Sequence, residues 1–104
     1  MVIVSLPVFN EVGCLEKTIS SVLGQTFQNF ELIISDNHSS DGSSDIIAKA
    51  VRRDARVRKV SPPTHMKSLD HGEWLLREVL NKERDKKYSI FIGGHDLWEP
   101  NLLQ

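Results

Sequence analysis

The chain has 104 residues, of which 39% are hydrophobic and 26% are charged, and this ordinary globular mixture excludes a disordered polypeptide. Thirteen basic residues nearly balance fourteen acidic ones, so the net charge of -1 gives no sign of a basic surface for nucleic acid. One cysteine excludes an internal disulfide framework and a cysteine-rich zinc site, and no apolar run approaches the roughly 20 residues of a membrane-spanning helix.

The chain begins with a predicted strand and helix. Residues 2–8 are β-branched and almost continuously apolar, which is typical of a strand buried on both faces. Pro7 cannot donate a hydrogen bond to a neighbouring strand, so we expect the pairing to end there. Apolar residues then recur with helical spacing over residues 12–23, with Asn10 as the expected N-cap and Gly24 as the stop.

A second strand and helix follow, and then a third strand. Residues 30–34 are apolar and run into the polar turn of residues 36–43, after which residues 46–51 form a second amphipathic stripe. Residues 56–60 are mostly charged, and charges protect an exposed sheet edge. The third strand is therefore predicted at the edge of the sheet.

The last predicted elements are a helix over about residues 70–80 and a strand over residues 88–92. Asp70 and Glu73 have the spacing of a capping box, which predicts the start of this helix. The alternation β-α-β-α-β-α-β predicts a Rossmann-like three-layer α/β/α fold with a mainly parallel sheet and right-handed crossovers. The apolar strands belong inside the sheet and the charged third strand at its edge, so we expect the strand order 3-2-1-4.

This order places a switch in topology between the first and fourth strands, and ligands bind such sheets beside the switch, at the carboxyl ends of the strands. The segments that converge there are residues 7–11, 36–43, 65–67 and 93–96. Asp36 ends the second strand and is expected to face a ligand, whereas Asp41 is expected to cap the following helix. The alternative is that both carboxylates only hold the turn.

Residues 93–96 are the second candidate site. Gly93 and Gly94 allow a ligand to approach the end of a strand closely, and His95 and Asp96 then offer a nitrogen and an oxygen donor side by side. This pair suits Mn²⁺ or another borderline divalent ion more than Mg²⁺. The alternative is a loop histidine beside a capping aspartate.

Charge and motif content limit how a phosphate could bind. Glu11, Asp36 and Asp96 would make the mouth of the site acidic, which favours a diphosphate bound through a bridging divalent cation, or no phosphate ligand at all. The sequence contains no Walker-type glycine–lysine loop and no Gly-x-Gly-x-x-Gly motif to bind phosphate by backbone amides alone. His65 and His71 have no partner at ligand spacing, so we assign them structural roles.

Four segments carry a family resemblance, in matching order and with matching spacing. They are V-S-L-P-V-F-N-E at residues 4–11, Q-T-F-Q-N-F-E at 25–31, S-D-N-H-S-S-D-G-S at 35–43 and F-I-G-G-H-D-L-W-E-P at 91–100. These segments resemble motifs of family 2 glycosyltransferases. The first resembles the opening strand with its P-x-(Y/F)-N-E turn, and the second resembles the linker into the next strand. The third is similar to the D-D-G-S-x-D-G-T segment, and the fourth stands where the family has its D-x-D and W-x-P motifs. The resemblance covers essentially the whole chain and implies the N-terminal, nucleotide-binding half of the GT-A fold.

The resemblance implies a donor-binding region that holds a nucleotide sugar, with a UDP-sugar as the expected ligand, together with Mn²⁺ or Mg²⁺. Residues 7–9 would line the base pocket, Asp36 would hydrogen-bond the base, and His95 or Asp96 would hold the metal on the diphosphate. The expected nucleotide-binding residues are Pro7, Val8, Phe9, Asn10, Glu11, Asp36, Lys67 and Gly94, and the expected metal ligands are His95 and Asp96.

Two departures from the family pattern leave an alternative open. Residues 93–95 (G-G-H) stand at the three positions of D-x-D, which shifts the expected metal ligands by one residue onto residues 95–96. Residues 37–38 (N-H) follow Asp36, where the family usually shows Asp-Gly. The alternative function is a non-catalytic module of the same fold with a degenerate site. A receiver-like phosphoacceptor domain is disfavoured because the acidic pair and the lysine expected around its acceptor are absent.

The chain stops about one turn into a helix expected to begin near Pro100, so we expect residues 1–104 to be a single, truncated domain. The resemblance implies an inverting enzyme of cell-envelope polysaccharide biosynthesis whose catalytic base lies beyond Gln104, so we expect no catalytic residue here and no activity of this chain alone. Expected partners are the nucleotide sugar, an unidentified glycan or lipid-linked acceptor and a second copy of the fragment, but no nucleic acid. We expect a cytoplasmic location, at the inner face of the membrane in the full-length protein.

Overall fold

The computed structural model describes residues 2–25, 29–82 and 88–91, in which strands and helices alternate as predicted. The strands are β1 (Val2–Val8), β2 (Phe30–Asp36), β3 (Val57–Val60) and β4 (Tyr88–Phe91). The helices are α1 (Val12–Leu23), α2 (Ser43–Arg53) and α3 (Ser68–Lys82). None of the helices in these ranges is both long enough and apolar enough to cross a membrane.

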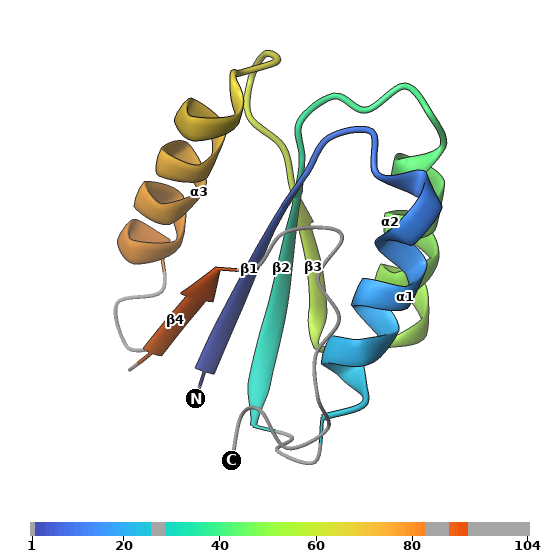
Figure 1. The fold of residues 1–104 in the computed structure, drawn as a ribbon. Helices are drawn as coiled ribbons and strands as arrows, with labels where there is room; N and C mark the ends of the chain where they lie inside the picture. The colour runs from blue at the N-terminus through green and yellow to red at the C-terminus, as the bar shows by residue number, and fades with distance from the viewer. Residues whose placement is uncertain (1, 26–28, 83–87, 92–104) are drawn as a thin grey trace.

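The four strands form one parallel sheet with the predicted order β3-β2-β1-β4. Helices α1 and α2 cover one face of the sheet and α3 covers the other, which gives three α/β/α layers (Figure 1). Every residue of β2 is buried except Glu31, which is half-buried, as expected for a strand inside the sheet. The exposed charges of Arg58 and Lys59 lie on β3, at the edge, where they oppose further strand pairing.

Successive side chains of each strand point to opposite faces of the sheet, so the core is divided into two clusters, one on each face. The larger cluster lies under α1 and α2 and consists of Val4, Leu6, Val8, Leu15, Ile19, Val22, Phe30, Leu32, Ile34, Ile47, Ala50 and Val57. The smaller cluster lies under α3 and consists of Ile3, Ile33 and Leu75, with Val60 and Trp74 packed against it. Each fully buried large side chain stabilises the fold by about 1.5–3 kcal/mol, so among the side chains that the structure describes the larger cluster contributes more of the hydrophobic stabilisation.

The pairing of β1 continues past Pro7, contrary to prediction. Pro7 is aligned with Ser35 and Val8 with Asp36, and the Asn37 N–H donates to the Val8 carbonyl at 2.8 Å. Consecutive residues of a parallel strand direct their backbone groups to opposite sides, so Val8 bonds toward β2 while the nitrogen of Pro7 faces away from it. The missing donor of Pro7 therefore leaves the β1–β2 ladder intact.

Helix α3 begins earlier than the sequence predicts. It starts at Ser68, and the His71 N–H donates to the Lys67 carbonyl at 2.8 Å. Asp70 thus lies inside the first turn, where its charge faces the positive end of the helix dipole, and the predicted capping box is wrong. His71 therefore lies in the first turn of α3, where it contacts Ser35 of β2.

Candidate functional site

Three loops meet at the carboxyl edge of the sheet. The first loop (residues 9–11) follows β1, the second loop (residues 37–42) follows β2 and the third loop (residues 61–67) follows β3. Because these strands are parallel, all three loops leave the same edge, at the top of Figure 1. This is the edge at which parallel sheets of this kind bind ligands.

The carboxylate of Asp36 lies at the end of β2 and is buried, with 3% of the residue exposed. Its Oδ1 accepts a hydrogen bond from the Ser39 N–H at 3.0 Å, and its Oδ2 accepts one from the Ser44 hydroxyl on α2. Burial raises the pKa of this carboxyl, but the hydrogen bonds from Ser44 and Ser39 and the charge of Lys59 outweigh it, so the pKa lies below its ordinary value. Asp36 is therefore an ionised hydrogen-bond acceptor at neutral pH.

Asn10 and Asp41 join the first loop to the second. Asn10 has a left-handed backbone (φ 50°), its N–H donates to Ser39 Oγ at 2.9 Å, and its Oδ1 accepts from the Ser40 N–H at 2.8 Å. The first turn of α1 is capped from the second loop, because Asp41 Oδ2 accepts from the Val12 N–H at 3.1 Å. The prediction that Asn10 is the N-cap of α1 is therefore wrong, and Asn10 instead holds the two loops together.

Asp41 also stabilises the start of α2, as predicted. Its Oδ1 accepts from the backbone N–H and the hydroxyl of Ser43, at 3.0 and 2.7 Å. These bonds to Ser43 are the main reason that the pKa of Asp41 lies below its ordinary value. Gly42 takes the N-cap position with φ 99°, a conformation that strains any residue with a side chain. One carboxylate thus holds the start of both helices on this face of the sheet.

The second and third loops are joined by a separate set of hydrogen bonds. The buried Asn37 side chain makes two bonds to Met66, as its Nδ2 donates to the carbonyl at 2.6 Å and its Oδ1 accepts from the N–H at 2.9 Å. His38 Nε2 lies 2.8 Å from the Pro62 carbonyl oxygen, and His65 Nδ1 lies 3.1 Å from the Asn37 carbonyl oxygen. The third loop is therefore held against the end of β2.

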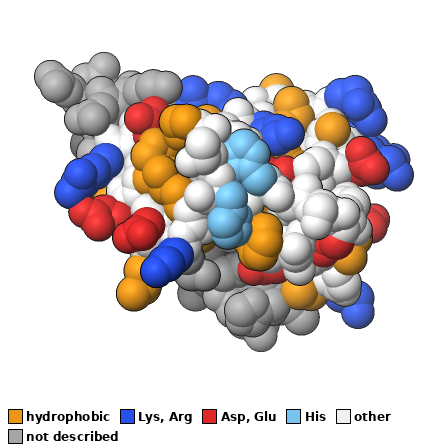
Figure 2. Space-filling model, turned by 90° about the horizontal axis from the view of Figure 1, so that it is seen from above, with side chains coloured by type: hydrophobic (Ala, Val, Ile, Leu, Met, Phe, Trp, Pro, Cys, Tyr) orange, Lys and Arg blue, Asp and Glu red, His pale blue; other side chains and the backbone are white. Residues whose placement is uncertain are grey.

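The rings of Phe9 and His65 meet on the exposed side of this edge. Their centroids are 4.6 Å apart and their planes are tilted by 52°. Phe9 is 43% exposed, and His65 is exposed as well. Seen from above, histidine side chains gather near the middle of this face (Figure 2). The pair gives the site an aromatic wall against which a flat ring of a ligand can pack.

His71 on α3 is buried beneath the same edge and contacts β2. Its Nε2 lies 2.7 Å from the hydroxyl oxygen of Ser35, the residue before Asp36. Burial lowers the pKa of His71, and the nearby His65 and His38 lower it further, while the charge of Asp36 acts in the opposite direction. The imidazole is therefore neutral at neutral pH. Its hydrogen bond to Ser35 links α3 to the end of β2.

Acidification should destabilise the protein through His71. Its pKa is lower in the folded chain than the ordinary value of 6.5 that applies when the chain is unfolded, so below that pH the unfolded chain binds more protons. The free energy of unfolding, measured with urea, should fall between about pH 7 and about pH 5 more steeply in the wild type than in His71→Gln, whose amide can still bond to Ser35. Equal pH slopes in the two proteins would contradict this assignment.

The structure places most of the predicted nucleotide-binding residues along the edge. The exposed or half-buried members are Pro7, Phe9, Asn10, Glu11 and Lys67. Val8 is 1% exposed and its side chain belongs to the core under α1 and α2, so only its backbone could line a pocket at this edge. Strand β1 continues through Val8, and because successive side chains of a strand point to opposite faces, the Val8 side chain points toward α1 and α2.

Sequence reasoning assigned structural roles to His65 and His71, and the contact of the buried His71 with Ser35 confirms this role for His71. His65 lies in the third loop, at the carboxyl edge where residues 65–67 were expected. Its contacts with Phe9 and Asn37 join residues far apart in the chain, and no local pattern indicates them.

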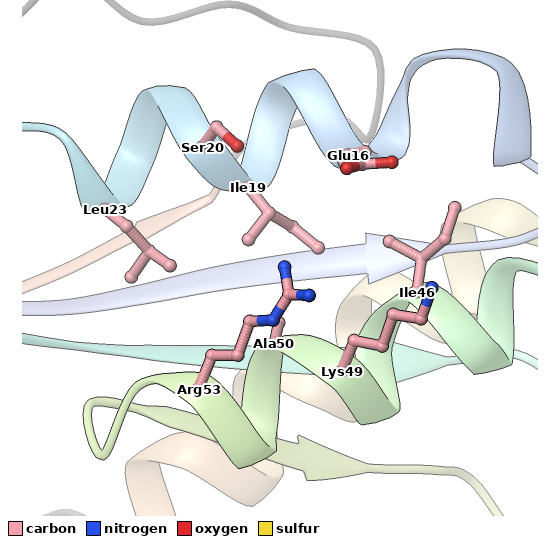
Figure 3. Close-up of a pocket in the computed structure, with 8 residues that line it drawn as sticks. All are labelled: Glu16, Ile19, Ser20, Leu23, Ile46, Lys49, Ala50 and Arg53. Atoms are coloured by element: carbon pink, nitrogen blue, oxygen red, sulfur yellow. The ribbon is translucent and has the colours of Figure 1, made fainter.

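A cavity between α1 and α2 lies away from the carboxyl edge (Figure 3). It has a volume of about 130 Å³ and is lined by Glu16, Ile19, Ser20, Leu23, Ile46, Lys49, Ala50 and Arg53. Pockets for small molecules usually measure about 300–1,000 Å³. The cavity is smaller than this, and none of the residues that line it belongs to the three loops of the carboxyl edge.

Three predicted site residues, Gly94, His95 and Asp96, lie outside the described residues. Within residues 2–25, 29–82 and 88–91, no group of three or more histidine, cysteine, aspartate or glutamate side chains is arranged to hold a metal ion. Strand β4 runs parallel to β1, with Phe91 aligned with Ser5, so its carboxyl end points toward the edge that carries the three loops.

Comparison with known proteins identifies relatives over the full chain. The model of the family described as Glycosyl transferase family 2 matches residues 3–104. An uncharacterized glycosyltransferase of Haemophilus influenzae is 37% identical over 104 residues, which cover 100% of this chain and 40% of that protein. The putative teichuronic acid biosynthesis glycosyltransferase TuaG of Bacillus subtilis is 28% identical over 104 residues, which cover 100% of this chain and 39% of that protein.

A solved structure shows the same fold. The crystal structure of S. aureus TarS 1–349 in complex with UDP superposes with a TM-score of 0.76 at 17% sequence identity, covering 98% of this chain and 29% of that chain. The chain spans about 40% of the length of the two relatives above. With the family model matched from residue 3 to residue 104 and the α/β/α fold of a GT-A enzyme, this chain belongs to glycosyl transferase family 2.

Proposed function

We propose that the carboxyl edge of the sheet binds the nucleoside diphosphate of a sugar donor, with UDP as the nucleotide, as the donor-binding region of a glycosyltransferase. The observation that carries this proposal is the buried, ionised carboxylate of Asp36 at the end of β2, on the edge where Phe9 and His65 form an aromatic wall. Membership of the family supports the class of reaction. The UDP in the TarS structure supports the choice of nucleotide.

Asp36 would select the base through the direction of its hydrogen bonds. A carboxylate only accepts hydrogen bonds and has about four lone-pair sites, of which Ser39 and Ser44 use two. Uracil and guanine present a ring N–H at their pairing edges. Cytosine and adenine present an exocyclic amino group there, but the lone pair of the adjacent unprotonated ring nitrogen repels a carboxylate. The carboxylate therefore favours a uridine or guanosine nucleotide over a cytidine or adenosine one.

The diphosphate needs positive charge at an edge that carries the carboxylates of Asp36 and Asp41. We propose that His95 and Asp96 hold Mn²⁺ or Mg²⁺ there, with the exposed Lys67 as a further cation. A nitrogen and an oxygen donor together suit Mn²⁺, and the direction of β4 toward this edge supports the placement. A metal bound there would neutralise the charge that develops on the departing nucleoside diphosphate.

Calorimetric titration with UDP, with and without Mn²⁺, tests this proposal. We expect UDP to bind in the presence of the metal and to lose most of its affinity when EDTA removes it. Asp96→Ala should reproduce that loss, whereas Glu16→Ala, which removes an exposed carboxylate of α1 beside the distant cavity, should not.

Failure of every nucleoside diphosphate to show metal-dependent binding would refute the donor site. That result would favour the alternative of a non-catalytic module of the same fold, because residues 93–95 (G-G-H) lack both aspartates of the D-x-D motif. In such a module Asp96→Ala would change stability at most.

For the complete enzyme we propose transfer with inversion to a glycan or lipid-linked acceptor at the inner face of the membrane. TuaG is named for teichuronic acid biosynthesis, which supports a role in the synthesis of cell-envelope polysaccharide. The catalytic base would then lie outside residues 1–104, and this chain by itself would transfer no sugar.

A further inference from the structure

We infer that His65 binds the nucleotide directly, with its Nε2 accepting a hydrogen bond from a ribose hydroxyl. This inference rests on the proposed function of the carboxyl edge and adds a ligand contact that lies in the third loop.

Two contacts fix the position of the His65 ring. Its Nδ1 lies 3.1 Å from the Asn37 carbonyl oxygen, and its centroid lies 4.6 Å from that of the Phe9 ring. Asn37 is itself held by its two hydrogen bonds to Met66, at 2.6 and 2.9 Å. A ligand would therefore meet a ring that is already oriented, which reduces the entropy lost on binding.

The same contacts determine which nitrogen of His65 is available. A carbonyl oxygen can only accept, so Nδ1 carries the proton that it donates to Asn37. In the neutral ring Nε2 then holds a lone pair. Within the part of the chain that the structure describes, Nε2 has no hydrogen-bond partner, and the residue is exposed. His65 thus presents an oriented acceptor beside the aromatic wall.

Only part of a UDP molecule can donate to this acceptor. The diphosphate oxygens accept hydrogen bonds, and the N3–H of uracil is bound by Asp36 in the proposed arrangement. The 2′ and 3′ hydroxyls of the ribose remain. Their place next to the base agrees with the position of His65, because its ring contacts Phe9 and its Nδ1 bonds to the residue that follows Asp36.

Removal of single hydroxyls separates ribose recognition from binding of the base and the phosphates. With Mn²⁺ present, at about pH 8, we expect the wild type to bind UDP about fivefold more tightly than the deoxy analogue, 2′-deoxy-UDP or 3′-deoxy-UDP, that lacks the bonded hydroxyl. His65→Phe keeps an aromatic ring beside Phe9 but has no acceptor, and it should bind UDP and that analogue equally.

His38→Asn is the matched control. It removes another exposed imidazole that bonds to the third loop, through Pro62, and asparagine tolerates the left-handed backbone of this position (φ 58°). If His38→Asn loosens the third loop, the affinity for UDP and for both deoxy analogues should fall by the same factor. His38→Asn should therefore keep the fivefold preference for UDP over the analogue that lacks the bonded hydroxyl.

Two results would overturn the assignment of His65 and leave the proposed function intact. One is that the wild type, with Mn²⁺ present, binds both deoxy analogues as tightly as it binds UDP. The other is a His65→Phe protein that keeps the wild-type preference. A wild type that binds no nucleoside diphosphate at all would overturn the proposed function and, with it, the role of His65.

Discussion

Asp36→Asn is expected to weaken UDP binding by about 10- to 100-fold and to abolish the preference for UDP over CDP. The substitution keeps the size of the side chain but replaces an ionised acceptor with an amide that also donates. The charge-assisted hydrogen bond to the uracil N3–H is lost, whereas the amide N–H groups can donate to the ring nitrogen of cytosine. Affinity for CDP should therefore fall less than affinity for UDP.

Calorimetric titration of both nucleotides measures this change, with Ser44→Ala as the control. Ser44→Ala removes one hydrogen bond to Asp36 but keeps the charged carboxylate, so it should retain the preference for UDP. A thermal unfolding curve for each variant establishes that it is folded under the conditions of the titration. An unchanged ratio of UDP to CDP affinity in Asp36→Asn would show that another residue selects the base.

Leu32→Ala is expected to lower the free energy of unfolding by about 2–5 kcal/mol. Leu32 is 0% exposed on β2, aligned with Val4 of β1 on one side and with Val57 of β3 on the other. Its side chain belongs to the larger core cluster, beneath α1 and α2. Truncation would remove buried apolar area and leave a cavity between the sheet and the two helices, which cannot close without disturbing the strand pairing.

Leu69→Ala provides the same chemical change at an exposed position. Leu69 is 88% exposed on α3, so its truncation should change the free energy of unfolding by no more than about 0.5 kcal/mol. Urea denaturation of the two variants measures both values. Equal losses of stability would contradict the placement of the core beneath α1 and α2.

The order of the strands was predictable because it depends on features that the sequence displays directly. Alternating apolar runs and helical stripes indicated the β-α units, and the charged residues of β3 indicated an edge strand. The carboxyl edge then followed as the proposed place of the ligand, and Asp36 lies at the end of β2 on that edge. The error at Pro7 arose because its missing N–H matters on only one side of the strand.

The details of the loops could not be predicted because their partners are distant in the sequence. Asn10 fits the local pattern of an N-cap, but Asp41 caps α1 from 29 residues away. The side chain of Asn37 bonds to Met66, also 29 residues away, and thereby positions His65. Such contacts depend on how the three loops meet, which only the folded sheet determines.

A crystal structure of the protein with UDP and Mn²⁺ would show directly whether the carboxyl edge is the donor site. We expect the uracil N3 within hydrogen-bonding distance of the Asp36 carboxylate, the base against Phe9, and the metal at His95 and Asp96 on the diphosphate. UDP bound elsewhere on the chain, with Asp36 contacting only Ser39 and Ser44, would contradict the assignment of the carboxyl edge as the donor site.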